Sequence, residues 1–198
     1  TPAIMNNPVY NNRSQKWLKR NADLQCSNIV SLPYNAGDVA VPTSYFNCVY
    51  QLFHLYHHYF YEGVGLRQIV DYYYVLGKSE EGRVKNLTAL QRELKHLGLW
   101  KFAGAVMYVL HVVLGLPEER MIRPMDVKRG RVFLDEILAG GNFGHYDTRI
   151  SFGNGAFGHN MQRLYRDLRL AWYYPGEALS EPVFRVWHFF WRKGQGSV

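Results

Sequence analysis

The sequence predicts an all-α protein, a single helical domain of about seven or eight helices. Apolar side chains recur at three- and four-residue steps through most of the chain, and no run of alternating strands occurs. In addition, 47% of the 198 residues are hydrophobic and only 20% are charged, which excludes a disordered chain. We expect three parts, namely an N-terminal loop, helix and irregular connector (1–42), the helical domain (43–193) and a frayed tail (194–198).

Proline and asparagine dominate the first stretch, which predicts a loop to about residue 12 and then a helix ending at Cys26. Residues 27–42 contain Pro33, Gly37 and Pro42, so we expect an irregular connector with an extended segment at residues 39–41. Thr43 or Ser44 is then the expected N-cap of the next helix.

The core of the predicted domain is a helical pair over residues 47–76, joined at a Gly-x-Gly corner formed by Gly63 and Gly65. Both glycines suit the positive φ that a sharp inter-helix turn requires. The inward stripe of the first helix should consist of Phe46, Val49, Tyr50, Phe53, His57 and Phe60. The inward stripe of the second should consist of Leu66, Ile69, Val70, Tyr73 and Leu76.

A polar ridge runs beside the first stripe and carries no lysine or arginine; it consists of Asn47, Gln51, His54, His58 and Glu62. A solvated helix face normally carries lysine or arginine, so we expect the ridge to face something other than bulk water. After the corner, Arg67 and Asp71 are four residues apart, within reach of an ion pair. Two interpretations stay open: these groups bind a phosphate or carboxylate of a substrate, or they form a structural ion pair at the corner.

Three further helices follow. The first should bury Leu87, Leu90, Leu94 and Leu97 and end at Gly98. The second, Trp100 to Leu116, is the most apolar, and its Gly104 is expected to permit close helix contact. The third, Asp126 to Leu138, should turn Val127, Leu134, Ile137 and Leu138 inward and stop at Gly140 and Gly141.

The last third of the chain holds a glycine-rich segment, residues 142–158, and two more predicted helices. The segment is predicted to be either a substrate-gating loop that uses His145 and Asp147 or a surface loop without a role. The helix over residues 159–173 should bury Leu168 and Trp172, present Arg163 on a basic face, and break at Pro175. A final helix should begin near Pro182.

Charge and cysteine content restrict the partners and the compartment. The formal charge of +7 suits phosphates or an acidic partner, but equally an ordinary surface, and we do not expect nucleic acid as a partner. Cys26 and Cys48 lie within helical patterns without a preceding signal peptide, which predicts buried free thiols and a cytoplasmic protein. The apolar run from Phe102 to Leu116 is too short to span a membrane.

His54, His57 and His58 form a His-x-x-His-His pattern, so a helical metal hydrolase is a third alternative. The glutamate that zincins place between two such histidines is missing, and the spacing offers no third ligand. We therefore expect no metal site here, with His57 packed in the core.

Residues 60–71, FYEGVGLRQIVD, resemble the Gly-Leu-Arg-Gln-x-x-Asp block of an uncharacterised, bacterial nucleotidyltransferase-like family. Residues 140–147 and residues 173–192 resemble further blocks of its Bacteroides-type members, and the opening at residues 7–17 is similar to the segment just after the family's catalytic sheet. The resemblance covers nearly the whole chain. It implies a transferase that uses Mg²⁺ to transfer a nucleotidyl group, with a helical part that completes the cleft for a nucleotide or sugar-type acceptor.

The family's Gly-Ser turn and paired metal-binding aspartates match no position in this sequence. We therefore expect a C-terminal helical fragment that is inactive alone, with Mg²⁺ required only where the catalytic half is present. By this resemblance the substrate-binding residues would be His54, His58, Glu62, Arg67, Asp71, His145, Asp147 and Arg163. A fragment without its catalytic sheet would expose an apolar face and self-associate. The alternative is a non-catalytic helical module that binds a protein partner or serves as a scaffold.

Overall fold

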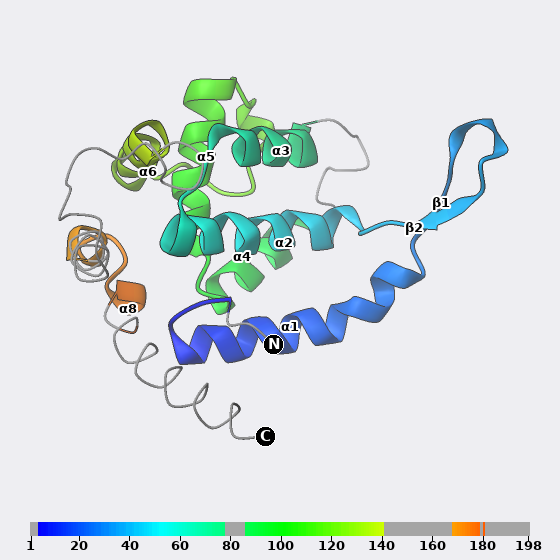
Figure 1. Ribbon diagram of the computed structural model, residues 1–198, viewed down its shortest axis with the longest axis horizontal. Helices are drawn as coiled ribbons and strands as arrows, with labels where there is room; N and C mark the ends of the chain where they lie inside the picture. Colours follow the sequence, from blue (N-terminus) through cyan, green and yellow to red (C-terminus); the bar gives the residue numbers. More distant parts are fainter. Residues whose placement is uncertain (1–3, 78–85, 141–167, 179, 181–198) are drawn as a thin grey trace, which may run out of the picture. The chain divides into compact units, whose positions relative to one another are not determined.

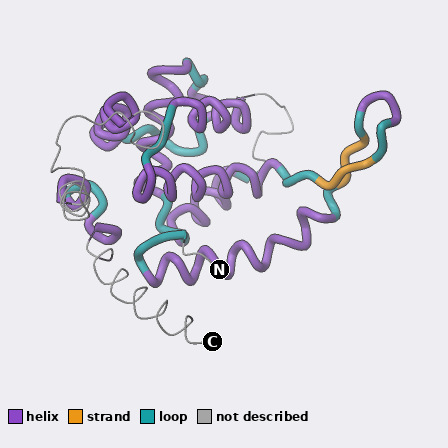
Figure 2. The backbone as a smooth tube through the Cα atoms, in the orientation of Figure 1, coloured by secondary structure: helices purple, strands orange, loops and turns teal. Residues whose placement is uncertain are grey.

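The computed structural model describes residues 4–77, 86–140, 168–178 and 180. These residues are mostly helical, with a single two-stranded hairpin among them (Figures 1 and 2), which confirms the all-α class. The chain divides into two compact units, Arg13–Tyr146 and Thr1–Asn12 with Asp147–Val198. In the described ranges we find no helix with the length and apolar character that a membrane crossing requires.

Helix α1 (Pro8–Cys26) begins at Pro8, earlier than the predicted residue 12. Asn7 caps it, because its Oδ1 accepts hydrogen bonds from the N–H groups of Val9 (3.1 Å) and Tyr10 (3.2 Å). Proline is well tolerated in the first turn, where its missing N–H would have no helical partner. The predicted N-terminal loop is therefore shorter than expected.

A hairpin follows, formed by β1 (Ile29–Ser31), a 3₁₀ turn (Pro33–Asn35) and β2 (Asp38–Ala40). It confirms the extended segment and leads into α2 (Ser44–His57), which is capped by Thr43, one of the two expected residues. Helices α1 and α2 run antiparallel, since Gln25 near the end of α1 accepts a hydrogen bond from the Thr43 N–H at 2.7 Å. Trp17 is only 1% exposed and stacks on Phe46 with ring centroids 5.1 Å apart.

Helix α3 (Leu66–Gly77) packs on α2 and buries Ile69, Tyr72 and Leu76. The Tyr72 hydroxyl donates a hydrogen bond to the Cys48 carbonyl oxygen of α2 at 3.0 Å. The prediction placed Leu66 and Tyr73 inward instead, but Leu66 is 40% exposed and Tyr73 only half-buried. The buried face is thus rotated toward Tyr72, whose ring bridges the two helices.

Three helices complete the larger unit: α4 (Leu87–His96), α5 (Trp100–Leu114) and α6 (Val127–Gly140), with a 3₁₀ turn (Glu118–Arg120) between the last two. Leu90, Leu94 and Leu97 are fully buried as predicted, whereas Leu87, the first residue of the helix, is 40% exposed. Gly98 has φ 77° after the helix. The core lies along α5, whose buried residues are Phe102, Ala103, Gly104, Ala105, Val106, Met107, Val109 and Leu110.

The predicted inward face of α6 is wrong in part. Val127 is 41% and Leu138 67% exposed, whereas Phe133 and Ile137 are buried. The reason is Gly130, where an added Cβ would lie 2.3 Å from the Tyr108 side chain of α5. Gly104 has a different neighbour from the one expected: it faces Arg123 and Asp126 of the connector rather than another helix.

The smaller unit is held by Glu177, which is only 4% exposed and lies in the short helix α8 (Pro175–Ala178). Its carboxylate accepts hydrogen bonds from the N–H groups of Asn6 (2.5 Å) and Asn7 (3.2 Å). Pro175 thus opens a new helix in addition to ending the previous one. Leu170 is buried there, while Leu168 (67% exposed) and Trp172 (79%) contradict the predicted inward face.

Candidate functional site

The site begins where α2 ends, at a π-helical turn (His58–Glu62). The Gly63 N–H donates to the His58 carbonyl oxygen, five residues back, at 2.6 Å. Such single π-turns are rare and occur frequently at functional sites. Gly63 then reverses the chain with φ 100° and ψ 143°, a conformation for which glycine is strongly favoured.

The positive φ predicted for Gly65 is wrong, because Gly65 is not among the positive-φ glycines of the described chain. It is buried, and its N–H donates to Oε1 of Gln68 at 3.0 Å. A glutamine three residues into a helix that accepts from the residue before the helix is one half of a capping box. The corner therefore depends on Gly63 for its positive φ and on Gly65 for the N–H that Gln68 accepts.

The histidines of the polar ridge lie on the last turn of α2 and in the π-turn. His54 is exposed and His58 half-buried, and their rings meet edge to face, with centroids 4.4 Å apart and planes at 86°. His57 is half-buried and stacks on Tyr61, with centroids 4.4 Å apart. The structure thus brings together the rings of His54 and His58, which lie on one predicted ridge. His57 is only half-buried, so it is not the core residue that we predicted.

Arg67 and Asp71 occupy the first two turns of α3, and both side chains are exposed. No ion pair joins them among the described residues, although their spacing permits one. The described chain therefore gives no support to an ion pair of Arg67 with Asp71 at the corner. An exposed guanidinium presents a planar fork of donors that fits two oxygens of a phosphate or carboxylate.

Four of the predicted substrate-binding residues cannot be placed. His145, Asp147 and Arg163 lie outside the described residues, as does the whole segment 142–158. Glu62 belongs to the π-turn, but its side chain is also outside the described part. The described candidate site consequently comprises His54, His58, Arg67 and Asp71.

Across residues 4–77, 86–140, 168–178 and 180, no three His, Cys, Asp or Glu side chains come close enough together to hold a metal ion. The edge-to-face packing of His54 on His58 fills the space between the two rings with ring atoms. The described chain therefore gives no support to the histidine-based hydrolase.

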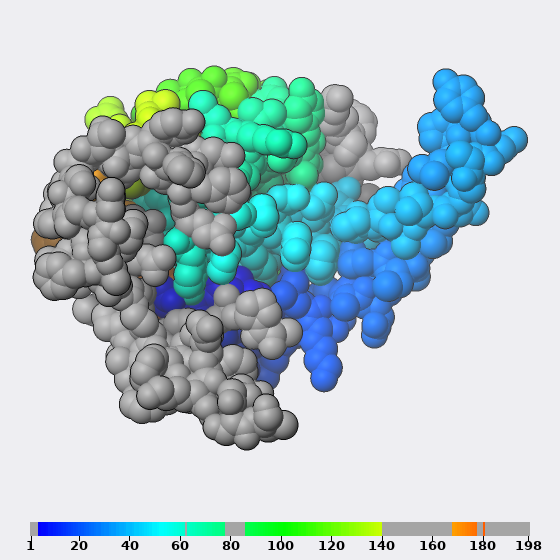
Figure 3. All heavy atoms as spheres, in the orientation of Figure 1, coloured from blue at the N-terminus to red at the C-terminus, as the bar shows by residue number. Residues whose placement is uncertain are grey.

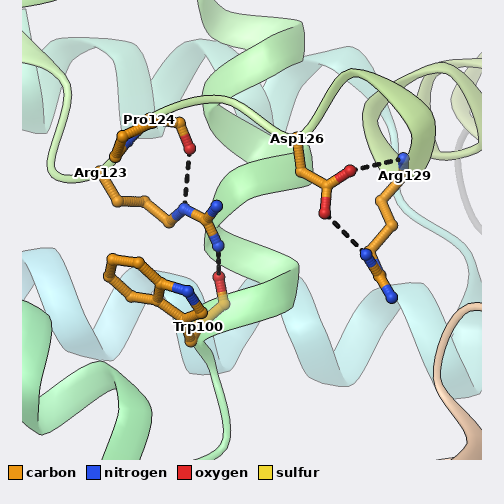
Figure 4. A network of polar contacts seen from close by, with 5 residues as sticks. All are labelled: Trp100, Arg123, Pro124, Asp126 and Arg129. Carbon is orange, nitrogen blue, oxygen red and sulfur yellow. Dashed lines mark hydrogen bonds and ion pairs between the residues drawn. The ribbon is translucent and has the colours of Figure 1, made fainter.

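A second polar cluster, at the start of α5 and α6, was not predicted from the sequence (Figure 4). The Arg123 guanidinium lies 4.2 Å from the centre of the Trp100 ring, and its Nε donates to the Pro124 carbonyl oxygen at 2.8 Å. Another of its nitrogens donates to the Trp100 carbonyl oxygen. Lys95 lies 4.6 Å from the same ring. Arg123 and Lys95 are thus both engaged by contacts within the protein, so we assign these contacts to the fold.

Asp126 belongs to this cluster and precedes α6. Partial burial alone would raise the pKa of its carboxyl group, but hydrogen bonds from the backbone and side chain of Arg129 outweigh burial. The charges of Arg129 and Arg123 act in the same direction, so the pKa of Asp126 lies below its usual value. An aspartate immediately before a helix was the sequence signal that could have revealed this cap.

The two cysteines lie in different environments. Cys48 is buried, and burial raises the pKa of its thiol to about 12, which keeps it protonated at neutral pH. Cys26, predicted to be buried, is exposed because it lies at the end of α1 where the hairpin begins. Both are free thiols.

A family model described as an uncharacterised nucleotidyltransferase matches residues 5–115. The match spans more than half of the chain and contains α2, the π-turn and α3 entirely. No curated protein and no solved structure matches the chain.

Proposed function

The chain belongs to this uncharacterised nucleotidyltransferase family, and we propose that it is the helical, substrate-binding portion of a nucleotidyltransferase. In this proposal the catalytic carboxylates lie in a part of the protein outside these 198 residues. Mg²⁺ held by such carboxylates would stabilise the charge that develops on the transferred phosphoryl group. The chain studied alone is then expected to be inactive.

The observation that carries the proposal is the exposed Arg67 beside the corner, in the middle of the stretch that matches the family. Among the described residues its guanidinium forms no ion pair with the nearby Asp71, so a ligand phosphate would not have to displace that carboxylate. The net charge of +7 favours the approach of an anionic nucleotide.

The histidines would complete the surface that receives the nucleotide or a sugar-type acceptor. His54 is exposed at the end of α2, and both His54 and His58 have ring nitrogens that can donate or accept hydrogen bonds to hydroxyl groups. Asp71 adds an exposed carboxylate one turn after Arg67, which suits the hydroxyls of a sugar. These roles are proposed from residue chemistry together with the family.

Calorimetric titration with ATP, CTP, GTP and UTP, each with Mg²⁺, tests the proposal on this chain and on the full-length protein. We expect binding by the full-length protein only, weakened about tenfold or more by Arg67→Ala, because a charge-assisted hydrogen bond contributes about 1.5–3 kcal/mol. Arg131→Ala is the matched control, since Arg131 is an exposed arginine of α6 and does not belong to the α2–α3 pair.

Two results would overturn this function. Equal losses in the Arg67→Ala and Arg131→Ala proteins would mean that nucleotides sense only the net charge. Absence of binding to the full-length protein would instead favour the non-catalytic binding module.

A further inference from the structure

Helix α3 presents three chemically different side chains on its outward face. We call this surface the α3 face; it consists of Arg67, Asp71 and Tyr74, which are all exposed. Because each residue turns an α-helix by about 100°, the three positions lie within about 60° of one another around the helix axis. The other side of α3 packs on α2 and α5, and Figure 3 shows α3 (teal) at the surface of the larger unit. The α3 face is therefore accessible to a ligand.

The side chains of the α3 face follow one another in the order of the parts of a nucleotide. Each residue advances an α-helix by about 1.5 Å, so Asp71 lies about 6 Å beyond Arg67 along the axis and Tyr74 about 4.5 Å beyond Asp71. Arginine binds phosphates through its fork of donors, a carboxylate accepts hydrogen bonds from sugar hydroxyls, and an aromatic ring stacks on a base. In a nucleotide the sugar likewise lies between the phosphates and the base. One extended nucleotide can therefore reach all three side chains.

The charges of α3 favour one of the two directions in which a nucleotide can lie on it. Arg67 stands in the first turn and is the only basic residue of α3. The amino-terminal end of a helix also favours negative charge, because the helix dipole places partial positive charge there. Asp71 repels phosphates from the middle of the helix. The phosphates therefore belong at the Arg67 end, which leaves the base at the Tyr74 end.

The Tyr74 ring is accessible for stacking. It meets the Tyr73 ring edge to face, with centroids 5.9 Å apart and planes at 87°. An edge-to-face contact covers at most one face of a ring, and Tyr74 is 51% exposed. Aromatic rings stack on any of the four bases, because every base has a π-face. Tyr74 can therefore hold a base whichever nucleotide binds.

We propose that Tyr74 is the base-stacking residue of the nucleotide site, and that a nucleoside triphosphate lies along α3 with its phosphates at Arg67 and its base on Tyr74. The inference rests on the proposed function, because it takes Arg67 as the phosphate contact. It adds the residue that holds the base and the direction of the bound nucleotide. Since stacking tolerates every base, Tyr74 contributes affinity without choosing among the four nucleotides.

Calorimetric titration of the full-length protein with the four nucleoside triphosphates and with inorganic triphosphate, each with Mg²⁺, tests the inference. We expect Tyr74→Ala to weaken nucleotide binding about fivefold to a hundredfold, since it removes the stacking contact, and to leave the binding of inorganic triphosphate unchanged. Arg67→Ala should weaken the binding of both kinds of ligand. Tyr74→Phe keeps the ring and should bind nucleotides like the wild type. Tyr34→Ala is the matched control, because Tyr34 is a fully exposed tyrosine of the hairpin and does not belong to α3.

Tyr74→Leu, which keeps an apolar side chain without a ring, should repeat the loss seen in Tyr74→Ala. If both variants bind nucleotides as tightly as the wild type while Arg67→Ala binds them weakly, the inference is overturned and the proposed function stands. Equal weakening of nucleotides and inorganic triphosphate by the two Tyr74 variants overturns the inference as well, because Tyr74 then only supports the fold of α3. Absence of nucleotide binding to the full-length wild type overturns the proposed function and the inference with it.

Discussion

Asp126 shows how one carboxylate can fix the junction of two helices. Its backbone N–H donates to the Gly104 carbonyl oxygen of α5 at 2.9 Å. Its side chain accepts hydrogen bonds from the Arg129 N–H at 3.1 Å and the Arg129 guanidinium at 2.8 Å. Asp126 thus caps α6 at the point where the start of this helix lies against Gly104 of α5 (Figure 4).

We expect Asp126→Ala to lower the free energy of unfolding by about 1–2 kcal/mol at neutral pH, because it removes the cap and the ion pair. Asp126→Asn keeps an acceptor for the Arg129 N–H and should lose less. The pKa of Asp126 is lowered in the folded state, so the unfolded state binds more protons near pH 4 and stability rises with pH there.

The contribution of the Asp126 charge is therefore complete above the unfolded pKa of about 3.9 and is lost as the pH falls through the lower folded value. Urea denaturation at pH 7 and at several pH values below 4 measures the difference between the wild type and Asp126→Asn. The difference should shrink as the pH falls. A difference that is constant with pH would show that the charge of Asp126 contributes nothing.

At the scale of elements, α5 and α6 depend on Gly130 for their close contact. A Cβ at this position would lie 2.3 Å from Cβ and Cγ of Tyr108, which is too close for non-bonded carbon atoms. We expect Gly130→Ala to destabilise the protein by about 1–3 kcal/mol through overpacking, although alanine favours a helix intrinsically. Thermal unfolding followed by circular dichroism measures this loss.

Gly77→Ala is the matched control for this prediction. It also lies in a helix, but an added Cβ there would meet only Tyr73, at 3.6 Å. Helix propensity should therefore leave its stability unchanged or slightly higher. If both alanine variants unfolded at the wild-type temperature, the close contact of α5 and α6 would not depend on Gly130.

The elements that the sequence predicted correctly are those whose apolar period is complete. Leu90, Leu94 and Leu97 repeat at helical steps and are all buried, so the face of α4 follows from the pattern except at its first residue, Leu87, which is 40% exposed. The face of α6 was predicted in part wrongly because a glycine, which no apolar pattern includes, forms its contact with α5. In α3 the period was ambiguous, because Tyr72 and Tyr73 both stand at helical steps from Ile69 and Leu76. The hydrogen bond of the Tyr72 hydroxyl to the Cys48 carbonyl oxygen selects Tyr72.

The candidate site was predictable only as a set of spacings. The four-residue step from His54 to His58 placed them on one ridge, and their rings do meet, since neighbours on a helix face lie at that distance. The same step put Arg67 and Asp71 within reach of an ion pair, which the described chain does not contain. Long exposed side chains lose entropy when they pair, so spacing permits an ion pair without requiring it. The π-turn has no sequence signal that we can identify.

At the scale of the whole molecule, burial is distributed very unevenly within the larger unit. Helix α5 is buried along most of its length, whereas the hairpin is exposed throughout. Amide hydrogen exchange reports the free energy of local opening, which is large in a buried helix and small where few apolar contacts hold the backbone. The two elements should therefore differ strongly in protection.

We expect the amides of residues 102–110 in α5 to exchange most slowly among the described residues, and those of residues 29–40 to exchange fastest in dilute solution. Hydrogen exchange followed by mass spectrometry measures both segments in one experiment. Exchange in residues 29–40 as slow as that in residues 102–110 would contradict this prediction.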